Sequence, residues 1–306
     1  MTSYKPTTNP KLYRRAVAAL VAVAVSYAAL NVAIRLMSPG FGPITQTYLR
    51  LLVGVIIALI IFRRQLRLQA LRTIPLRDWA VLILMGTVGY SLGVIFVTLG
   101  ALHAILINVS VLTSTIPFFA AIYAFLVLRK PTPRHLLGFL VLSFIGAAMV
   151  ATHTFPPALH NLGLGELYVV LSAACFAWFG IGRQLLTRHL NNAEITVATM
   201  SIACLSSLIG AVFTGETLHP EAFLNPLVLL GLAIGAICNV MATQFENFAF
   251  QHINVVAGSQ ILLLENAVSP VAGYLLYAEV PTSYEVLGAL LIIGSVYSAI
   301  RLEAKS

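Results

Sequence analysis

Two ionisable side chains, Arg50 and Glu265, lie deep inside long apolar segments of the sequence, where charged residues are otherwise rare. A charge at the centre of a lipid bilayer costs about 2.5–3.5 kcal/mol on insertion scales, so it normally faces protein or a water-filled cavity. Three interpretations are open. The two residues form a structural ion pair, one of them binds a solute or a proton, or each has a separate partner. Glu246 lies nearer the end of its own segment and is a weaker candidate.

Uncharged polar residues recur along the same segments at helical spacing. In the segment 255–277, polar and small residues fall within an arc of about 120° at roughly 100° per residue, so they share one helix face. Such stripes either line a cavity or join neighbouring helices by hydrogen bonds, each contributing on the order of 0.6–2 kcal/mol. Trp178 lies well inside its segment, where its indole N–H needs a partner or its ring lines a cavity. The candidate cavity residues are Asn31, Arg50, Tyr90, Asn108, Trp178, Asn239, Glu265 and Asn266.

Two of these segments carry residues that could couple solute movement to a driving force. Glu265 is the candidate proton-coupling residue, because burial opposes the charged form of a carboxyl group. Pro117 and Pro270 interrupt two apolar segments at corresponding positions. A proline frees a backbone carbonyl and supplies a bend point, so the sequence predicts a hinge at each, with a static kink as the alternative.

The sequence carries no motif that indicates catalysis. HExxH, GxSxG and P-loop patterns are absent, as is a carboxylate cluster suited to a metal. Cys175, Cys204 and Cys238 lie inside apolar segments without metal-ligand spacing, and we interpret them as core side chains without a disulfide. We therefore expect no catalytic residue, no metal site and no cofactor. Without a nucleotide-binding motif, uphill transport would have to use an ion gradient or exchange.

The elements that position these residues follow from composition. Apolar residues make up 59% of the chain and charged residues only 9%, whereas a soluble domain carries about a quarter charged residues. The apolar blocks are about 20 residues long, which matches a hydrocarbon core of about 30 Å. We expect an all-α membrane protein with ten transmembrane helices. The predicted spans are 16–35, 43–62, 79–99, 104–127, 135–152, 163–184, 194–214, 227–249, 255–277 and 284–302.

The basic residues predict the orientation of these spans. With the N-terminus inside, every Lys and Arg except Arg35 and Arg50 falls on the cytoplasmic side, as the positive-inside rule requires. Both termini are therefore predicted to be cytoplasmic. The net charge of +8 does not indicate nucleic-acid binding, because the basic residues are scattered over loops without interleaved aromatics. Such loops lie near the anionic headgroups of the lipid bilayer.

Two loops reveal an internal repeat. Arg129-Lys130-Pro131-Thr132 is followed by Gly138 and an apolar helix, and Glu279-Val280-Pro281-Thr282 is followed by Gly288 and another. The first copy is rich in basic residues and the second has none until Arg301, so the positive-inside rule puts them on opposite sides of the membrane. Five spans in each half also force the second half to enter the membrane the other way up. The sequence thus predicts two inverted five-helix repeats, an architecture found in transporters.

Three stretches of the sequence carry a resemblance to known proteins. They are Tyr48-Leu49-Arg50-Leu51-Leu52, Cys175-Phe176-Ala177-Trp178 and Leu263-Leu264-Glu265-Asn266-Ala267-Val268-Ser269-Pro270, the last followed by Ala278-Glu279 and Gly288. These stretches resemble the EamA domains of the drug/metabolite transporter superfamily. In the first half, Arg129 stands where that family usually has Glu, and Thr115 roughly replaces Glu265. The resemblance extends from about Arg14 to Arg301 and implies carriage of small organic metabolites, often amino acids or related compounds and often outward.

The predicted organisation is a cytoplasmic tail (1–13), a first EamA-like repeat (14–152), an outer linker (153–162) and a second EamA-like repeat (163–302). We predict a multi-pass secondary transporter of the cell inner membrane. It would export a small polar organic molecule by alternating access through a central cavity, with proton coupling. An importer of a similar solute is the alternative within this class. A membrane-embedded enzyme and a non-transporting scaffold are the alternatives outside it.

Overall fold

A computed structural model describes residues 9–67, 69, 73–104, 106–156, 162–187, 189–277 and 280–303. The predicted tail up to residue 8, residues 157–161 of the predicted linker, and Ala278 and Glu279 of the second loop lie outside this part of the chain. The described residues form helices and connecting turns and contain no strand. The helices are α1 (Pro10–Met37), α2 (Pro43–Phe62), α4 (Leu76–Leu84), the π-helical η1 (Met85–Leu92), α5 (Gly93–His103), α6 (Leu106–Thr113), α7 (Ile116–Leu126), α8 (Arg134–Thr152), α9 (Leu164–Leu185), α10 (Asn192–Thr214), the short 3-10 helix η2 (Pro220–Leu224), α11 (Pro226–Phe250), α12 (Val255–Leu262), α13 (Leu264–Tyr277) and α14 (Ser283–Glu303).

Within the described ranges, nine helical stretches are long and apolar enough to cross a membrane, counting α4–η1–α5 and α6–α7 as one stretch each. The predicted span 255–277 is divided at Leu263 into α12 and α13, and its apolar part, Val255–Val268, is shorter than the other nine. The chain is therefore a multi-pass helical protein. A tenth transmembrane helix and the inverted relation of the halves remain predictions.

The helix ends follow local capping chemistry more than hydropathy. The first helix begins at Pro10, inside the predicted tail, because Asn9 accepts hydrogen bonds from the backbone N–H groups of Lys11 and Leu12. Proline is favoured in the first turn, where its missing N–H would have had no helical partner. At α10, Asn191 and Glu194 form a reciprocal capping box.

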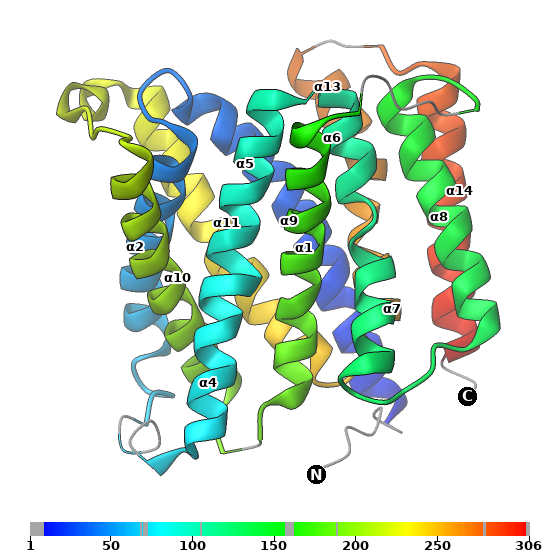
Figure 1. Ribbon diagram of the computed structural model, residues 1–306, viewed down its shortest axis with the longest axis horizontal. Coiled ribbons are helices and arrows are strands. Elements are labelled where there is room, and N and C mark those ends of the chain that lie inside the picture. The colour runs from blue at the N-terminus through cyan, green and yellow to red at the C-terminus, as the bar shows by residue number, and fades with distance from the viewer. Residues whose placement is uncertain are drawn as a thin grey trace.

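The most extensive helix–helix contacts join α1 to α11, α8 to α14, α2 to α10 and α5 to α9. Each of these pairs takes one helix from each predicted half, so the interface between the halves runs through the whole bundle. Figure 1 shows α8 and α14 side by side at one edge of the molecule. This edge position agrees with the few polar residues in the middle of each helix, which are Ser143 in α8 and Ser295 and Ser298 in α14.

The bundle has two distinct ends. The start of α1, the end of α14 and the connection between α7 and α8 lie at one end, and the start of α14 lies at the other (Figure 1). We call these the terminal end and the far end. At the terminal end the Tyr13 hydroxyl donates to Glu303 Oε2 over 3.1 Å, and Glu303 Oε1 accepts from the backbone N–H of Asn254. At the far end, His153 Nδ1 lies 3.5 Å from Glu285 Oε2.

A second contact fixes the terminal end. The Glu194 carboxylate, whose side chain is fully buried, accepts from Arg67 Nε at 2.9 Å and from Arg67 Nη2 at 3.0 Å. These hydrogen bonds raise the pKa of the Arg67 guanidinium. They tie the loop after α2 to the first turn of α10, and so join the two predicted halves.

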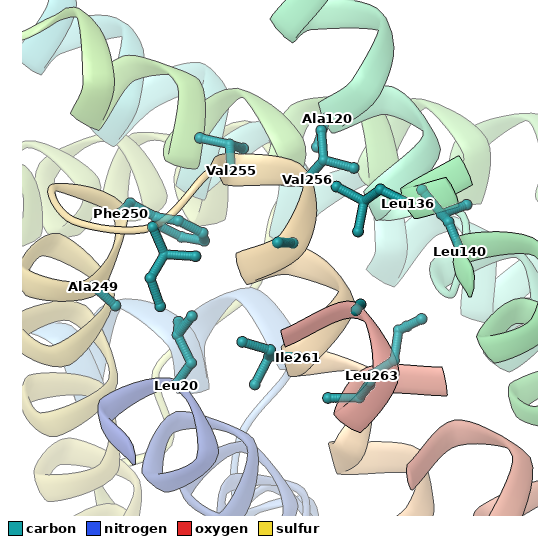
Figure 2. Packing of buried hydrophobic residues seen from close by; sticks show 14 of the residues in the cluster. Leu20, Ala120, Leu136, Leu140, Ala249, Phe250, Val255, Val256, Ile261 and Leu263 are labelled. Atoms are coloured by element: carbon teal, nitrogen blue, oxygen red, sulfur yellow. The ribbon is translucent and has the colours of Figure 1, made fainter. Parts of the chain in front are cut away.

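The largest cluster of buried apolar side chains also lies toward the terminal end. Leu20 of α1, Phe250 of α11 and Val255 of α12 meet there with side chains of α7, α8 and α14. Figure 2 shows Phe250 between Val255 and Leu20. This packing closes the centre of the bundle at the terminal end.

Candidate functional site

A cavity of about 930 Å³ lies between the two predicted halves. Its lining comes from α1, α2, η1, α5, α6, α7 and the end of α8 in the first half, and from α9, α11, α12, α13 and the start of α14 in the second. The cavity extends to His153 and Glu285 at the far end. In the other direction it ends on Phe250 and Val255, which also belong to the apolar cluster described above. We call these two residues the floor.

Glu265 lies in the cavity wall with Asn31 of α1 as its neighbour. The Asn31 side-chain amide donates a hydrogen bond of 2.8 Å to Glu265 Oε1. Asn266, beside Glu265 in α13, also lines the cavity, and its amide lies 3.5 Å from Ser114 Oγ. Asn31 and Glu265 are therefore brought together at the contact between α1 and α13, whereas Asn266 contacts the break between α6 and α7.

Glu246 of α11 is a site residue that sequence reasoning underrated. It lines the cavity with 7% of its surface exposed, and it accepts a hydrogen bond of 2.8 Å from the Tyr27 hydroxyl. Tyr27 and Asn31 lie one turn apart on α1, so a single helix face supports both carboxyl groups. Nearness to the end of its own apolar segment suggested contact with bulk water. In the bundle, however, the cavity reaches nearly to that depth. The polar stripe that Glu246 shares with Asn239 was the available signal.

Arg50 of α2 lines the same cavity but does not pair with Glu265. It makes no ion pair with any described carboxylate, so the interpretation as an Arg50–Glu265 pair is wrong. Its Nη2 donates a long hydrogen bond of 3.3 Å to Thr47 Oγ1, while Nε and Nη1 are buried without a partner. Arg50 and Glu265 were expected to meet because they lie at similar depths in their helices. In the structure, Asn31 occupies the position beside Glu265.

Tyr90 and Asn239 form a hydrogen-bonded pair between η1 and α11. Tyr90 lines the cavity, and its hydroxyl donates to Asn239 Oδ1 over 3.0 Å. Asn239 is buried and does not reach the cavity surface, which corrects its assignment as a lining residue. It orients Tyr90 from behind.

Two further predicted residues lie elsewhere. Asn108 is fully buried and donates to Glu166 Oε1 over 2.7 Å, so it joins α6 to the start of α9 and does not face the cavity. The Trp178 ring packs edge-on against Tyr123 at 5.8 Å, beside the apolar cluster. Its neighbours Ala177 and Phe179 line the cavity instead. The prediction that Asn108 and Trp178 line the cavity is therefore wrong. Helical periodicity gives the spacing of a polar stripe, but it does not say which neighbouring helix the stripe faces.

The proline positions differ from each other. The break between α6 and α7 falls at Ser114 and Thr115, just before Pro117 in the first turn of α7. Pro117 cannot donate the hydrogen bond that would continue the preceding helix. Pro270 lines the cavity from inside α13, and the break between α12 and α13 lies at Leu263. The prediction that Pro270 interrupts the helix is therefore wrong. Whether either break acts as a hinge stays a prediction.

Comparison with known proteins gives a consistent picture. The sequence model of the EamA-like transporter family matches residues 14–152 and 163–301. A riboflavin transporter of Brucella anthropi is 25% identical over 282 residues, which cover 90% of this chain and 95% of that protein. A Bacillus subtilis protein named as the uncharacterized transporter YcxC is 23% identical over 218 residues, covering 69% of this chain and 70% of that protein. A solved structure, titled only as the crystal structure of a protein, superposes with a TM-score of 0.75 at 11% identity, covering 96% of this chain and 97% of that one.

Proposed function

Because this chain belongs to the EamA-like transporter family, we propose that it is a secondary transporter that exports a small polar organic solute, such as an amino acid, across the cell inner membrane. The cavity carries this proposal. It lies between the two family repeats and holds the carboxyl groups of Glu246 and Glu265. Its volume of about 930 Å³ falls within the range of about 300–1,000 Å³ typical of small-molecule sites.

Alternating access between the repeats is supported by the way the cavity ends. It extends to the far end of the bundle, and Phe250 and Val255 close it toward the terminal end. Movement of one repeat against the other would close the far end and open the floor, as in other carriers built from repeats. The contacts of Tyr13 with Glu303 and of Arg67 with Glu194 join the two halves at the terminal end and would have to break in that movement.

The distribution of charge supports a cytoplasmic position for the terminal end. The loops after α2 and α7 both lie there and carry Arg63, Arg64, Arg129 and Lys130. The positive-inside rule favours such loops in the cytoplasm. With that orientation the cavity faces outward, the state in which an exporter releases its solute.

Proton coupling is supported by the carboxyl groups of Glu246 and Glu265 in the cavity. Each accepts a hydrogen bond from α1, which a shift of α1 against α11 and α13 would break. A carboxyl group that changes its partners between two states binds a proton with different affinity in each, and this difference couples protonation to the movement.

Flux into proteoliposomes tests the proposal. The purified chain is reconstituted, and uptake of labelled amino acids is measured with and without an imposed proton gradient, in both directions. We expect saturable uptake that the gradient accelerates in one direction. Liposomes that hold heat-unfolded protein are the control. If none of the solutes shows saturable movement in either direction, the transporter assignment of this cavity is wrong.

A planar heteroaromatic solute is the second candidate. Aromatic side chains of α1, η1, α9 and α11 line the cavity, among them Tyr27, Tyr90, Phe176 and Phe250, and such rings favour stacking on flat ligands. The relative named as a riboflavin transporter is consistent with a solute of this kind. The same flux assay with labelled riboflavin separates the two candidates. A carrier for planar heteroaromatic solutes should show saturable riboflavin flux that amino acids do not inhibit, whereas an amino acid carrier should show no saturable riboflavin flux.

A further inference from the structure

The Arg50 guanidinium is a buried cation, and no carboxylate among the described residues is its counter-ion. Only 5% of the residue is exposed, yet it contributes to the cavity wall. Two of its three nitrogens, Nε and Nη1, have no hydrogen-bond partner, and the third makes only the long contact to Thr47. Native structures normally satisfy a buried guanidinium with a carboxylate or with several acceptors, because its desolvation is otherwise not compensated.

The surroundings hold the guanidinium in place without pairing it. A Cβ added to Gly235 of α11 would lie 2.4 Å from Arg50 Cδ, so the missing side chain of Gly235 makes room for the Arg50 stem. Asn239 lies one turn further along the same face of α11. Its Nδ2 is also buried without a partner, while its Oδ1 is taken by Tyr90. Donors without acceptors therefore gather between α2 and α11.

The acidic residues that line the cavity do not fill this role, and Glu285 lies at the far end beside His153. Glu246 accepts from Tyr27 and Glu265 accepts from Asn31, both on α1. The cavity is therefore divided, with carboxyl groups facing α1 and free donors between α2 and α11. An arginine fork matches the geometry of a carboxylate or a phosphate, which it binds through paired charge-assisted hydrogen bonds.

We propose that Arg50 is the anion-recognition residue of the cavity, and that the transported solute carries a carboxylate or phosphate group. This rests on the transport function proposed above and narrows its substrate class. Nε and Nη1 are buried and shielded from the cavity. Rotation of the side chain over Gly235 turns them toward an entering anionic group, which takes the place of the missing counter-ion.

Binding to the purified full chain tests this without a membrane gradient. The probes are matched pairs that differ in one anionic group: amino acids and their carboxamides, and sugar phosphates and the corresponding sugars. Sodium chloride at equal ionic strength represents a simple inorganic anion. We expect the anionic member of at least one pair to raise the thermal unfolding midpoint in a concentration-dependent way, and its neutral partner to have no effect. Arg50→Gln should weaken that binding by about 10- to 100-fold.

Two variants separate recognition from a structural role. Arg50→Met removes an uncompensated buried charge, so it should raise the unfolding midpoint of the protein without solute, whereas loss of a structural arginine would lower it. Gly235→Ala keeps Arg50 but displaces its stem, and should weaken anion binding. Gly294→Ala is the matched control, because a Cβ at Gly294 meets nothing within 4 Å.

Several results would overturn the proposal. These are a lower unfolding midpoint in Arg50→Met, undiminished anion binding in Arg50→Gln, equal binding of charged and neutral partners, an equal effect of sodium chloride alone, or no stabilisation by any anionic probe. Anion binding without flux in proteoliposomes would leave the recognition site intact and contradict only the transport function. Saturable flux of solutes without an anionic group would support the transport function and contradict the proposed anion recognition by Arg50.

Discussion

Asn31 and Glu265 are 234 positions apart in the chain and are joined by one hydrogen bond of 2.8 Å inside the central cavity. One turn earlier on the same helix, Tyr27 makes the corresponding contact with Glu246. A single face of α1 therefore holds both acidic side chains, one on α11 and one on α13. Because α1 belongs to the first repeat and its two partners to the second, any movement between the repeats acts directly on both carboxyl groups.

Replacing Glu265 with Gln should separate solute binding from coupling. Gln keeps the size and the acceptor oxygen of the side chain but cannot exchange a proton, so solute exchange across the membrane should persist while acceleration by a proton gradient is lost. Counterflow and gradient-driven uptake in proteoliposomes measure the two activities. Glu221→Gln is the control, because Glu221 lies in η2 outside the cavity and pairs with His219.

Glu246→Gln gives the complementary result. If Glu265→Gln keeps full dependence on pH and gradient while Glu246→Gln loses it, coupling belongs to the α1–α11 contact and the assignment to Glu265 is wrong. Loss in both variants would mean that the two carboxyl groups act together.

Removing the Phe250 ring should open the floor of the cavity. Phe250 is 3% exposed, and its ring packs so closely on α12 that a Cβ at Gly258 would lie 2.6 Å from it. Phe250→Ala is expected to lower the free energy of unfolding by about 3–5 kcal/mol, as for large aromatic truncations in packed cores. It should also make a cysteine placed at Val255 accessible to a membrane-permeant thiol reagent. Phe125→Ala, at a side chain that is 61% exposed, should do neither. Equal protection of that cysteine in both backgrounds would show that the floor is closed by other side chains.

The crossing of α8 and α14 should depend on glycine at two positions. A Cβ at Gly146 would lie 2.6 Å from the Gly288 carbonyl oxygen, and a Cβ at Gly288 would lie 2.5 Å from the Gly146 carbonyl oxygen. Gly146→Ala and Gly288→Ala should each lower the unfolding midpoint, because backbone cannot move aside as a flexible side chain can. Gly138→Ala meets no neighbour, so it should stabilise α8 by about 0.5–1 kcal/mol. Thermal unfolding in detergent measures all three, and a stabilising Gly288→Ala would contradict the close crossing.

The two ends of the bundle should be reached from opposite sides of the membrane. Pro131 lies in the connection before α8 and Val280 in the connection before α14, and both are exposed. In a background without Cys175, Cys204 and Cys238, Val280→Cys should react with an impermeant thiol reagent added to intact cells. Pro131→Cys should react only after the membrane is opened. Labelling of both positions from the same side would overturn the inverted repeat and the proposed orientation.

Much of the fold follows from local properties that the sequence displays directly. Apolar blocks as long as a bilayer is thick predict spanning helices, and nine of them are observed among the described residues. The resemblance to the family is confirmed by the match to residues 14–152 and 163–301. Local patterns were weaker guides to helix interruptions: Pro117 follows a break, but the break near Pro270 lies at Leu263. A proline's effect depends on whether neighbouring helices hold the turn together.

By itself, the sequence determined the class of protein, the positions of the helices and the short set of polar residues able to act inside them. These depend on composition and helical period, which each segment carries alone. Only the tertiary structure decided which of those residues meet. In the structure, Asn108 and Trp178 contact neighbouring helices instead of the cavity. Glu246 lines the cavity, Asn31 donates a hydrogen bond to Glu265, and Arg50 pairs with no described carboxylate. A helix's period fixes which side chains share a face, but the tilt and rotation of its neighbours decide what that face touches.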